Sequence, residues 1–342
     1  MTLALPLALR RSLVFAWLLA LLLLALVLGV GLGAVPLSPA EVVRALLGQV
    51  ENPIVTELRL PRVLGGMLVG AALALAGAAF QGLFRNPLAD PYLMGSASGA
   101  AFAVTLFASL LGGLTPAFAQ HGVFQNLPPS ATLFGFLGAL AATLLTLVLA
   151  GGVARTQELV LAGVVVGSVL TGATTYLMLQ DADRVRAVFA YTLGNLAFLG
   201  WPAVRGLALL LLLAVPPLLF LGRALNALQL GEETARSLGL PLEALKLLLL
   251  LSASLLTAAA VAQAGIIGFV GLVTPHALRR LLGEDYRLLL PASALGGAVL
   301  LALADLLART LARPAELPVG VVTTLLGGPF FLYLMWRRRG RA

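Results

Sequence analysis

The chain contains no cysteine, two histidines and few charged residues of any kind. Without cysteine, neither disulfides nor thiolate metal sites can form. Charged residues make up 11% of the 342 residues and hydrophobic residues 60%, with a mean hydropathy of +1.03. Soluble domains are about one quarter charged and about half apolar. This composition therefore indicates an integral membrane protein.

Motifs for several kinds of chemistry are also missing. Lys246, in "EALKL", is the single lysine, and no GxxxxGK[ST] segment is present, which excludes a P-loop ATPase. Neither His121 nor His276 has a cluster of ligands around it, so we predict no metal site. Asp305 is the one acid expected within a span, and we expect it to pair with Arg309, four residues later, near the outer surface. The shortage of intramembrane acids argues against a proton-coupled carrier.

What the sequence does contain is a series of apolar runs longer than 18 residues. In lipid every backbone polar group needs an internal partner, so these runs predict helices and an all-α polytopic membrane protein. We expect a single transmembrane domain over residues 1–342, with a weak inverted repeat that relates 76–87 to 264–275. The ten expected spans are 12–34, 63–82, 92–113, 132–153, 159–179, 203–221, 242–262, 266–282, 291–309 and 317–336.

An even number of spans places both termini on one side of the membrane. With ten spans, fourteen of the 22 basic residues fall on the side of the termini and eight on the other. The positive-inside rule then predicts cytoplasmic termini, with Arg59, Arg62 and Arg309 facing outward. The net charge of +8 does not indicate nucleic-acid binding, since the arginines are scattered at span ends. The first outward segment contains "SPAEVVRALLG", in which Ser38 and Glu41 predict a capping box around Pro39.

The order of several motifs resembles one family of transporters. "LRLPR" precedes the second span, "NPLADPYLMG" follows it, and "LQLGEETARSLGLP" fills the largest inward loop. "GIIGFVGLVTPHALRRLLGEDYRLLLP" and "ADLLARTLARPAELPVGVVTTLLGGPFF" cover the last three spans. Together these segments are similar to the FecCD/BtuC-like permeases, the transmembrane subunits of type II ABC importers for iron-siderophores, haem or cobalamin.

The resemblance implies an importer subunit that is not itself an enzyme and carries no cofactor. It would work in the cell (inner) membrane as a homodimer surrounded by lipid, with two ABC ATPase subunits that bind ATP and a soluble substrate-binding protein outside. The coupling loop of about 223–241 would engage the ATPase through Gly231, Glu232, Glu233, Arg236 and Gly239. The remaining implied roles are docking of the binding protein for Arg59, Arg62 and Arg309, a cytoplasmic gate for Asn86, Leu88, Thr156 and Gln157, and pathway lining for Thr171, Thr174 and Thr175.

Other interpretations of the same residues stay open at this point. The arginines could anchor to lipid phosphates, the threonines could bond their own helix backbone, and the gate and coupling residues could be ordinary turns. Gln157 departs from the serine or threonine that is common in the family. A secondary transporter or a channel-like subunit is the alternative function, and the sequence does not name the substrate.

Overall fold

The computed structural model describes residues 7–33, 37–111, 129–180, 189, 191–313 and 315–339. His121 lies outside the described residues. Within them the chain is entirely helical, with no β-strand. Its elements are α1 (Leu7–Gly31), α2 (Pro39–Leu46), η1 (Ile54–Arg59, a π-helix), α3 (Leu60–Leu83), η2 (Pro91–Met94, a 3₁₀-helix), α4 (Ser96–Leu111), α6 (Pro129–Leu149), α7 (Thr156–Leu179), α9 (Trp201–Phe220), α10 (Gly222–Gln229), α11 (Glu232–Ser237), α12 (Leu242–Ala264), α13 (Val270–Leu282), α14 (Tyr286–Thr310) and α15 (Val319–Arg339).

A helix occupies each of the ten ranges predicted to span the membrane, but the helices are unequal. Seven described helices are long and apolar enough to cross a bilayer, and α4 and α15 supply shorter apolar stretches. The remaining helix, α13, has 13 residues. At 1.5 Å per residue it is about 20 Å long, less than the hydrocarbon core of about 30 Å. The all-helical membrane fold is confirmed, whereas the count of ten full crossings stays a prediction.

Helix α3 lies at the centre of the molecule, among α14, α12, α13 and α9. Its small residues allow this close packing. A Cβ added to Gly70 would overlap the carbonyl oxygen of Gly297 on α14, and one added to Gly77 would overlap that of Gly271 on α13. Gly and Ala let helix backbones approach each other in this way, which explains why the second span is rich in both.

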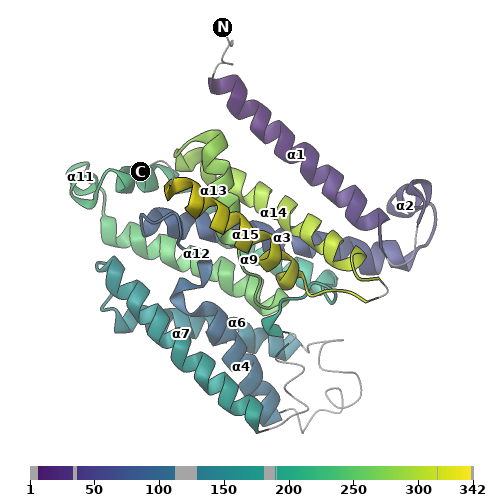
Figure 1. Cartoon of the computed structure of the whole chain (residues 1–342), viewed down its shortest axis with the longest axis horizontal. Coiled ribbons are helices and arrows are strands. Elements are labelled where there is room, and N and C mark those ends of the chain that lie inside the picture. The colour runs from purple at the N-terminus through teal and green to yellow at the C-terminus, as the bar shows by residue number, and fades with distance from the viewer. Residues whose placement is uncertain are drawn as a thin grey trace.

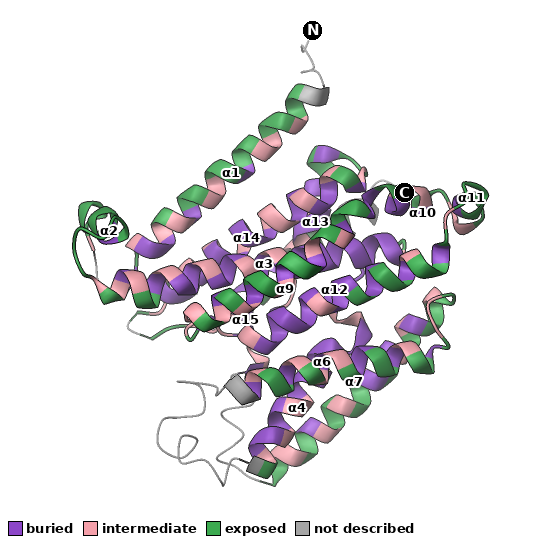
Figure 2. Cartoon of the chain, turned by 180° about the vertical axis from the view of Figure 1, so that it is seen from behind, coloured by how far each residue is buried: buried purple, intermediate pink, exposed green. Residues whose placement is uncertain are grey.

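Helices α4, α6 and α7 form a second group, which α12 connects to the central one (Figure 1). The contact between α4 and α6 again uses glycine, since a Cβ on Gly99 would overlap the carbonyl of Gly138. Burial differs strongly from helix to helix (Figure 2). Most of α3 is buried, whereas only 22% of the apolar stretch of α1 and of α7 is buried. These exposed apolar surfaces are the ones available to lipid or to a second subunit.

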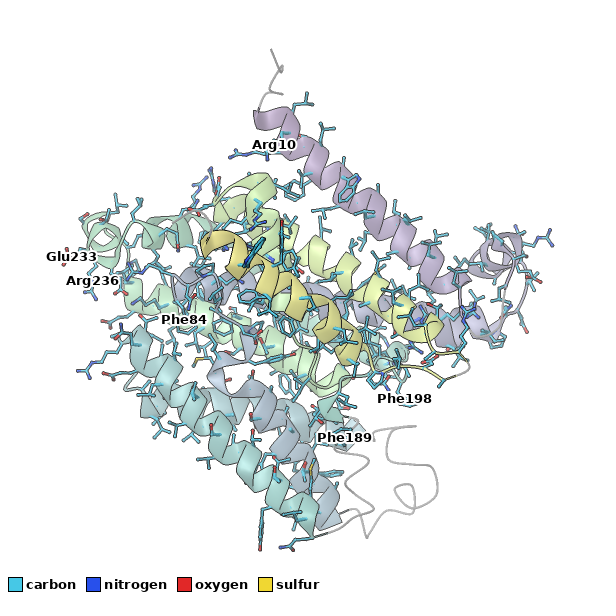
Figure 3. The ribbon with its side chains drawn as sticks, in the orientation of Figure 1. Arg10, Phe84, Phe189, Phe198, Glu233 and Arg236 are labelled. Carbon is cyan, nitrogen blue, oxygen red and sulfur yellow. The ribbon has the colours of Figure 1, made fainter. Side chains whose placement is uncertain are left out.

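Two ends of the helical bundle carry most of the predicted site residues. The first end contains the C-terminus of α1, the segment η1 with the beginning of α3, and the C-terminus of α14. We call it the arginine end. The coupling end contains the C-terminus of α3, the helices α10 and α11, and the beginning of α14. Figure 3 shows Phe84, Glu233 and Arg236 on the coupling side, far from Phe198.

Two local predictions can be compared with the structure. Ser38 and Glu41 form the expected capping box of α2, with Ser38 Oγ accepting from the Glu41 amide at 3.2 Å. The proposed repeat has no counterpart in local structure. Residues 76–83 are helical and then turn, whereas 265–269 are non-helical and α13 begins at Val270.

Candidate functional site: a buried arginine network, a surface groove and a coupling end

Arg62 is the centre of a buried charge network at the arginine end. Its Nε and Nη2 donate to both carboxylate oxygens of Asp305 at 2.8–3.2 Å, and its Nη1 donates to Glu316 at 2.8 Å. Arg309 lies on the other side of Asp305, with Nε 3.0 Å from Oδ2, which confirms the predicted pair four residues apart. One carboxylate therefore serves two guanidinium groups, through charge-assisted contacts that are roughly twice as strong as neutral hydrogen bonds.

Arg59 and Arg309 also tie the network to the end of α1. A helix leaves its last four carbonyl groups without intrahelical partners, and cationic side chains stabilise them. The carbonyls of Val30 and Gly31 accept from Arg59, and those of Gly29 and Leu32 accept from Arg309, at 2.9–3.3 Å. The three arginines thus come together as predicted, and they join α1, α3 and α14.

The network is enclosed within this chain. Arg59, Arg62 and Arg309 are only 6%, 9% and 4% exposed. Glu316 is the accessible member, with 40% of its side chain exposed. The sequence did not indicate that Arg62 would pair with Asp305 and Glu316. Asp305 is 243 residues and Glu316 254 residues away along the chain. Docking of a binding protein at these arginines stays a prediction.

An open groove of about 550 Å³ runs between α7 and the segment formed by η2 and the beginning of α4. The two walls approach closely at one point, where a Cβ on Gly163 would overlap the carbonyl oxygen of Leu93. Thr171 reaches across the groove and donates from Oγ1 to Ser98 Oγ at 3.2 Å. The lining consists of Asp90, Tyr92, Leu93, Gly95, Ser98, Gly163, Val164, Gly167, Ser168 and Thr171.

The three threonines predicted to line a pathway behave differently. Thr171 lies in the groove lining. Thr174 donates to the Leu170 carbonyl at 2.7 Å and Thr175 to the Thr171 carbonyl at 3.0 Å, the helix back-bonding expected of a threonine in an apolar span. Neither is in the groove lining. The polar residues that sequence reasoning missed in the groove are Asp90, Ser98 and Ser168.

Asp90 is held at the floor of the groove by its own backbone turn. Its Oδ1 accepts from the Tyr92 amide at 2.8 Å and caps η2, and Gly95 ends η2 with φ of +74°, which suits glycine. Burial raises the pKa of the Asp90 carboxyl to about 6, against the opposing effect of that amide. The Tyr92 hydroxyl accepts from the backbone N–H of Ile267 and donates to its carbonyl, both at 3.1 Å.

The residues predicted to form a gate occupy two segments. Asn86 and Leu88 lie in the loop after α3, where Asn86 Oδ1 accepts from the Leu88 amide at 2.9 Å and the Leu88 side chain is exposed. Thr156 and Gln157 form the first turn of α7. Both segments have the local structure expected of ordinary turns and helix starts. The gate role stays a prediction.

Helix α11 projects from the coupling end. Gly231 and Gly239 bracket it with φ of +113° and +78°, which confirms that glycine is needed for its turns. Glu233 and Arg236 point outward (Figure 3). Glu232 instead turns back to Lys246 at 2.7 Å, and Lys246 is buried. Leu230 and Leu238 are 70% and 62% exposed, so the tip combines charges with bare apolar surface.

Helix α10 contacts the C-terminal end of α3, just before the loop that contains Asn86 and Leu88. Gln229 Nε2 donates to the Gly82 carbonyl at 3.0 Å. A Cβ on Gly82 would lie 2.7 Å from Leu225 Cδ2 and 2.8 Å from Tyr286, so the surfaces are in direct contact. Asn226 donates to Asp285 and accepts from the Tyr286 amide, both at 2.8 Å. Helix α10 is thus joined directly to the end of α3 that precedes the loop with Asn86 and Leu88.

His276 and Arg279 border a cavity of about 220 Å³ beside this contact. Arg279 Nη2 donates to Gln81 at 3.1 Å and to the Tyr286 hydroxyl at 3.3 Å, which joins α13 to α3 and α14. Arg279 thereby anchors the end of α13. No group of three His, Cys, Asp or Glu residues suited to a metal ion occurs in the part of the chain that the structure describes.

The all-helical fold, the packed core and the projecting α11 define a transmembrane permease of an ABC transporter. Residues 21–337 match the sequence profile of the FecCD transport family, and the chain belongs to that family. It is 41% identical to the hemin transport system permease protein HmuU of Yersinia pestis, over 93% of this chain and 95% of that protein. It is 38% identical to the Fe(3+) dicitrate transport system permease protein FecC of Escherichia coli, over 90% and 91%.

A solved structure supports the same assignment. A metal-chelate type ABC transporter in an inward-facing conformation matches with a TM-score of 0.80 and 29% identity, covering 95% of this chain and 99% of that one. The predicted family and class are thus confirmed. The chain is the permease subunit of an importer whose ATP hydrolysis resides in a separate subunit.

Proposed function

We propose that this permease moves a large metal chelate, such as an iron-siderophore, haem or cobalamin, across the cell (inner) membrane. The match to the FecCD transport family over residues 21–337 is the observation that carries the proposal. Relatives that handle hemin, ferric dicitrate and cobalamin are all about 40% identical, so the family membership does not choose among them.

The groove on α7 supports a homodimer. Ser168, Thr171 and Thr175 follow each other at helical spacing on exposed positions. In a single subunit these hydroxyl groups and the groove itself would face lipid, where polar groups are costly. A second copy that covers this face would enclose two grooves around a common axis and make one pathway.

The two ends suit the two remaining partners. At the coupling end, α11 offers exposed charges and apolar side chains to an ATPase, and α10 connects it to the gate loop at Asn86 and Leu88. At the arginine end, Arg62 and Arg309 share the Asp305 carboxylate and Arg62 also meets the accessible Glu316, which suits exchange with a carboxylate of an acidic binding protein. Both termini would then be cytoplasmic.

The proposal is tested by reconstituting the permease in proteoliposomes with its ATPase inside and its binding protein outside. Haemin, ferric citrate and cyanocobalamin serve as probes. Uptake of one of them should require internal ATP and should stop when the ATPase is omitted. Uptake that continues without ATP, or that follows an imposed proton gradient, would favour the secondary-transporter alternative.

A further inference from the structure

The groove contains a single formally charged residue. Among its ten lining residues only Asp90 and Tyr92 can ionise, and no arginine or lysine lines it. The other polar side chains are the neutral hydroxyl groups of Ser98, Ser168 and Thr171. The electrostatic character of this surface therefore depends on one carboxylate.

In the described part of the chain, no lysine or arginine side-chain nitrogen lies within 4 Å of the Asp90 carboxylate. No cation therefore neutralises Asp90 there. Its Oδ1 is engaged by the Tyr92 amide, and the carboxylate is fixed by the turn before η2. The helices that pack against η2 are α3, α4, α6, α7 and α12. Their ionisable residues are Arg62, Glu158, Tyr176, Glu243 and Lys246, none of which lines the groove.

We propose that Asp90 gives the groove a negative potential that admits neutral or cationic chelates and opposes carboxylate-rich anionic ones. The inference rests on the proposed function, because it treats the groove as part of the pathway. It assigns the permease a share in selecting cargo by charge. A hydroxyl-lined surface with one anion can exchange hydrogen bonds with many chelates, while the Coulomb interaction distinguishes their sign.

The absence of cysteine allows a direct measurement in the intact protein. A Ser168→Cys variant places one thiol in the groove wall, on an exposed position of α7. Two methanethiosulfonate reagents of similar size, one with a trimethylammonium group and one with a sulfonate group, then modify that thiol. The ratio of their rates reports the local potential, and the thiolate fraction cancels because both reagents meet the same thiol.

Asp90→Asn in this background should lower the cation-to-anion rate ratio by about threefold to tenfold. Coulomb's law gives this range for unit charges about 10 Å apart at an effective dielectric constant of about 20–40 and an ionic strength of about 0.1 M. Asparagine keeps an oxygen acceptor for the Tyr92 amide, so the turn is preserved. Asp90→Glu should retain most of the ratio, and Glu158→Gln, a carboxylate on α7 outside the groove, should leave it unchanged.

The pH profile provides a second reading. With a pKa of about 6, Asp90 is mostly ionised at pH 7 and protonated at pH 5. The rate ratio in the Asp90 protein should therefore fall on acidification from pH 7 to pH 5, while that of the Asp90→Asn variant stays flat. A ratio that Asp90→Asn changes by less than twofold would overturn the charge proposal, and ATP-dependent uptake by the same preparation would show that the importer function still holds.

Discussion

Asp305 offers the sharpest test of the arginine network. It is 2% exposed and pairs with both Arg62 and Arg309. Asp305→Asn removes the shared negative charge and leaves two buried guanidinium groups facing each other. Breaking a buried ion pair by removing one partner costs about 3–5 kcal/mol, much of it from the uncompensated charge. We expect a loss of this size in the free energy of unfolding.

The natural fluorescence of the chain reports the change. Trp201 donates from Nε1 to the Thr56 carbonyl at 2.9 Å, close to the network. Unfolding in mixed micelles, followed by tryptophan emission, gives the free energy for each variant. Glu158→Gln is the matched control, because its ion pair with Arg155 is exposed and such pairs contribute about 0–1 kcal/mol.

A double variant separates charge balance from general damage. Adding Arg309→Met to Asp305→Asn removes one of the unbalanced cations, so part of the lost stability should return. Equal losses for Asp305→Asn and Glu158→Gln would refute the reasoning. So would a double variant whose loss is the sum of the two single losses, since residues in one network should couple.

Three further outcomes are expected. Gly77→Ala should prevent normal folding, seen as loss of the monodisperse peak in size-exclusion chromatography, because its methyl group meets backbone on α13, whereas Gly328→Ala on α15 should elute normally because nothing lies within 4 Å of its added methyl group. Lys246→Met should weaken ATPase binding at least tenfold in a pull-down titration, because α11 loses its buried anchor, and Arg236→Gln, which is exposed, should weaken it less. Glu316→Gln should increase binding-protein affinity if the network docks that partner, since it frees an Arg62 donor, and unchanged affinity in a surface-binding assay would contradict docking there.

The sequence was informative wherever the relevant contacts are local. The apolar runs predicted the long helices, the four-residue spacing predicted the Asp305–Arg309 pair, and the SPAE segment predicted the cap of α2. Contacts between distant segments could not be read in this way. The Arg62–Asp305 pair joins residues 243 apart, and the groove brings together Asp90, just before η2, and Ser168 on α7.

Sequence periodicity also could not decide what each threonine does. Thr171 and Thr174 are three residues apart in the same span, yet one reaches Ser98 and the other bonds its own helix. The difference depends on which neighbour lies within reach of each hydroxyl group, and that is set by the packing of α4 on α7. Lys246 is a similar case, since its buried partner Glu232 lies on a separate helix.

A charge network that only holds helices together can be distinguished from one that also binds a partner protein. A network built only to hold helices together gains most when its charges cancel, because every uncompensated buried ion is costly. Here Arg62 and Arg309 share Asp305, Arg62 also pairs with Glu316, and Arg59 and Arg309 donate to carbonyls at the end of α1. Glu316 is the accessible member, so a carboxylate of a partner could exchange with it on Arg62. Stability and partner binding at this end are therefore expected to depend on the same arginines.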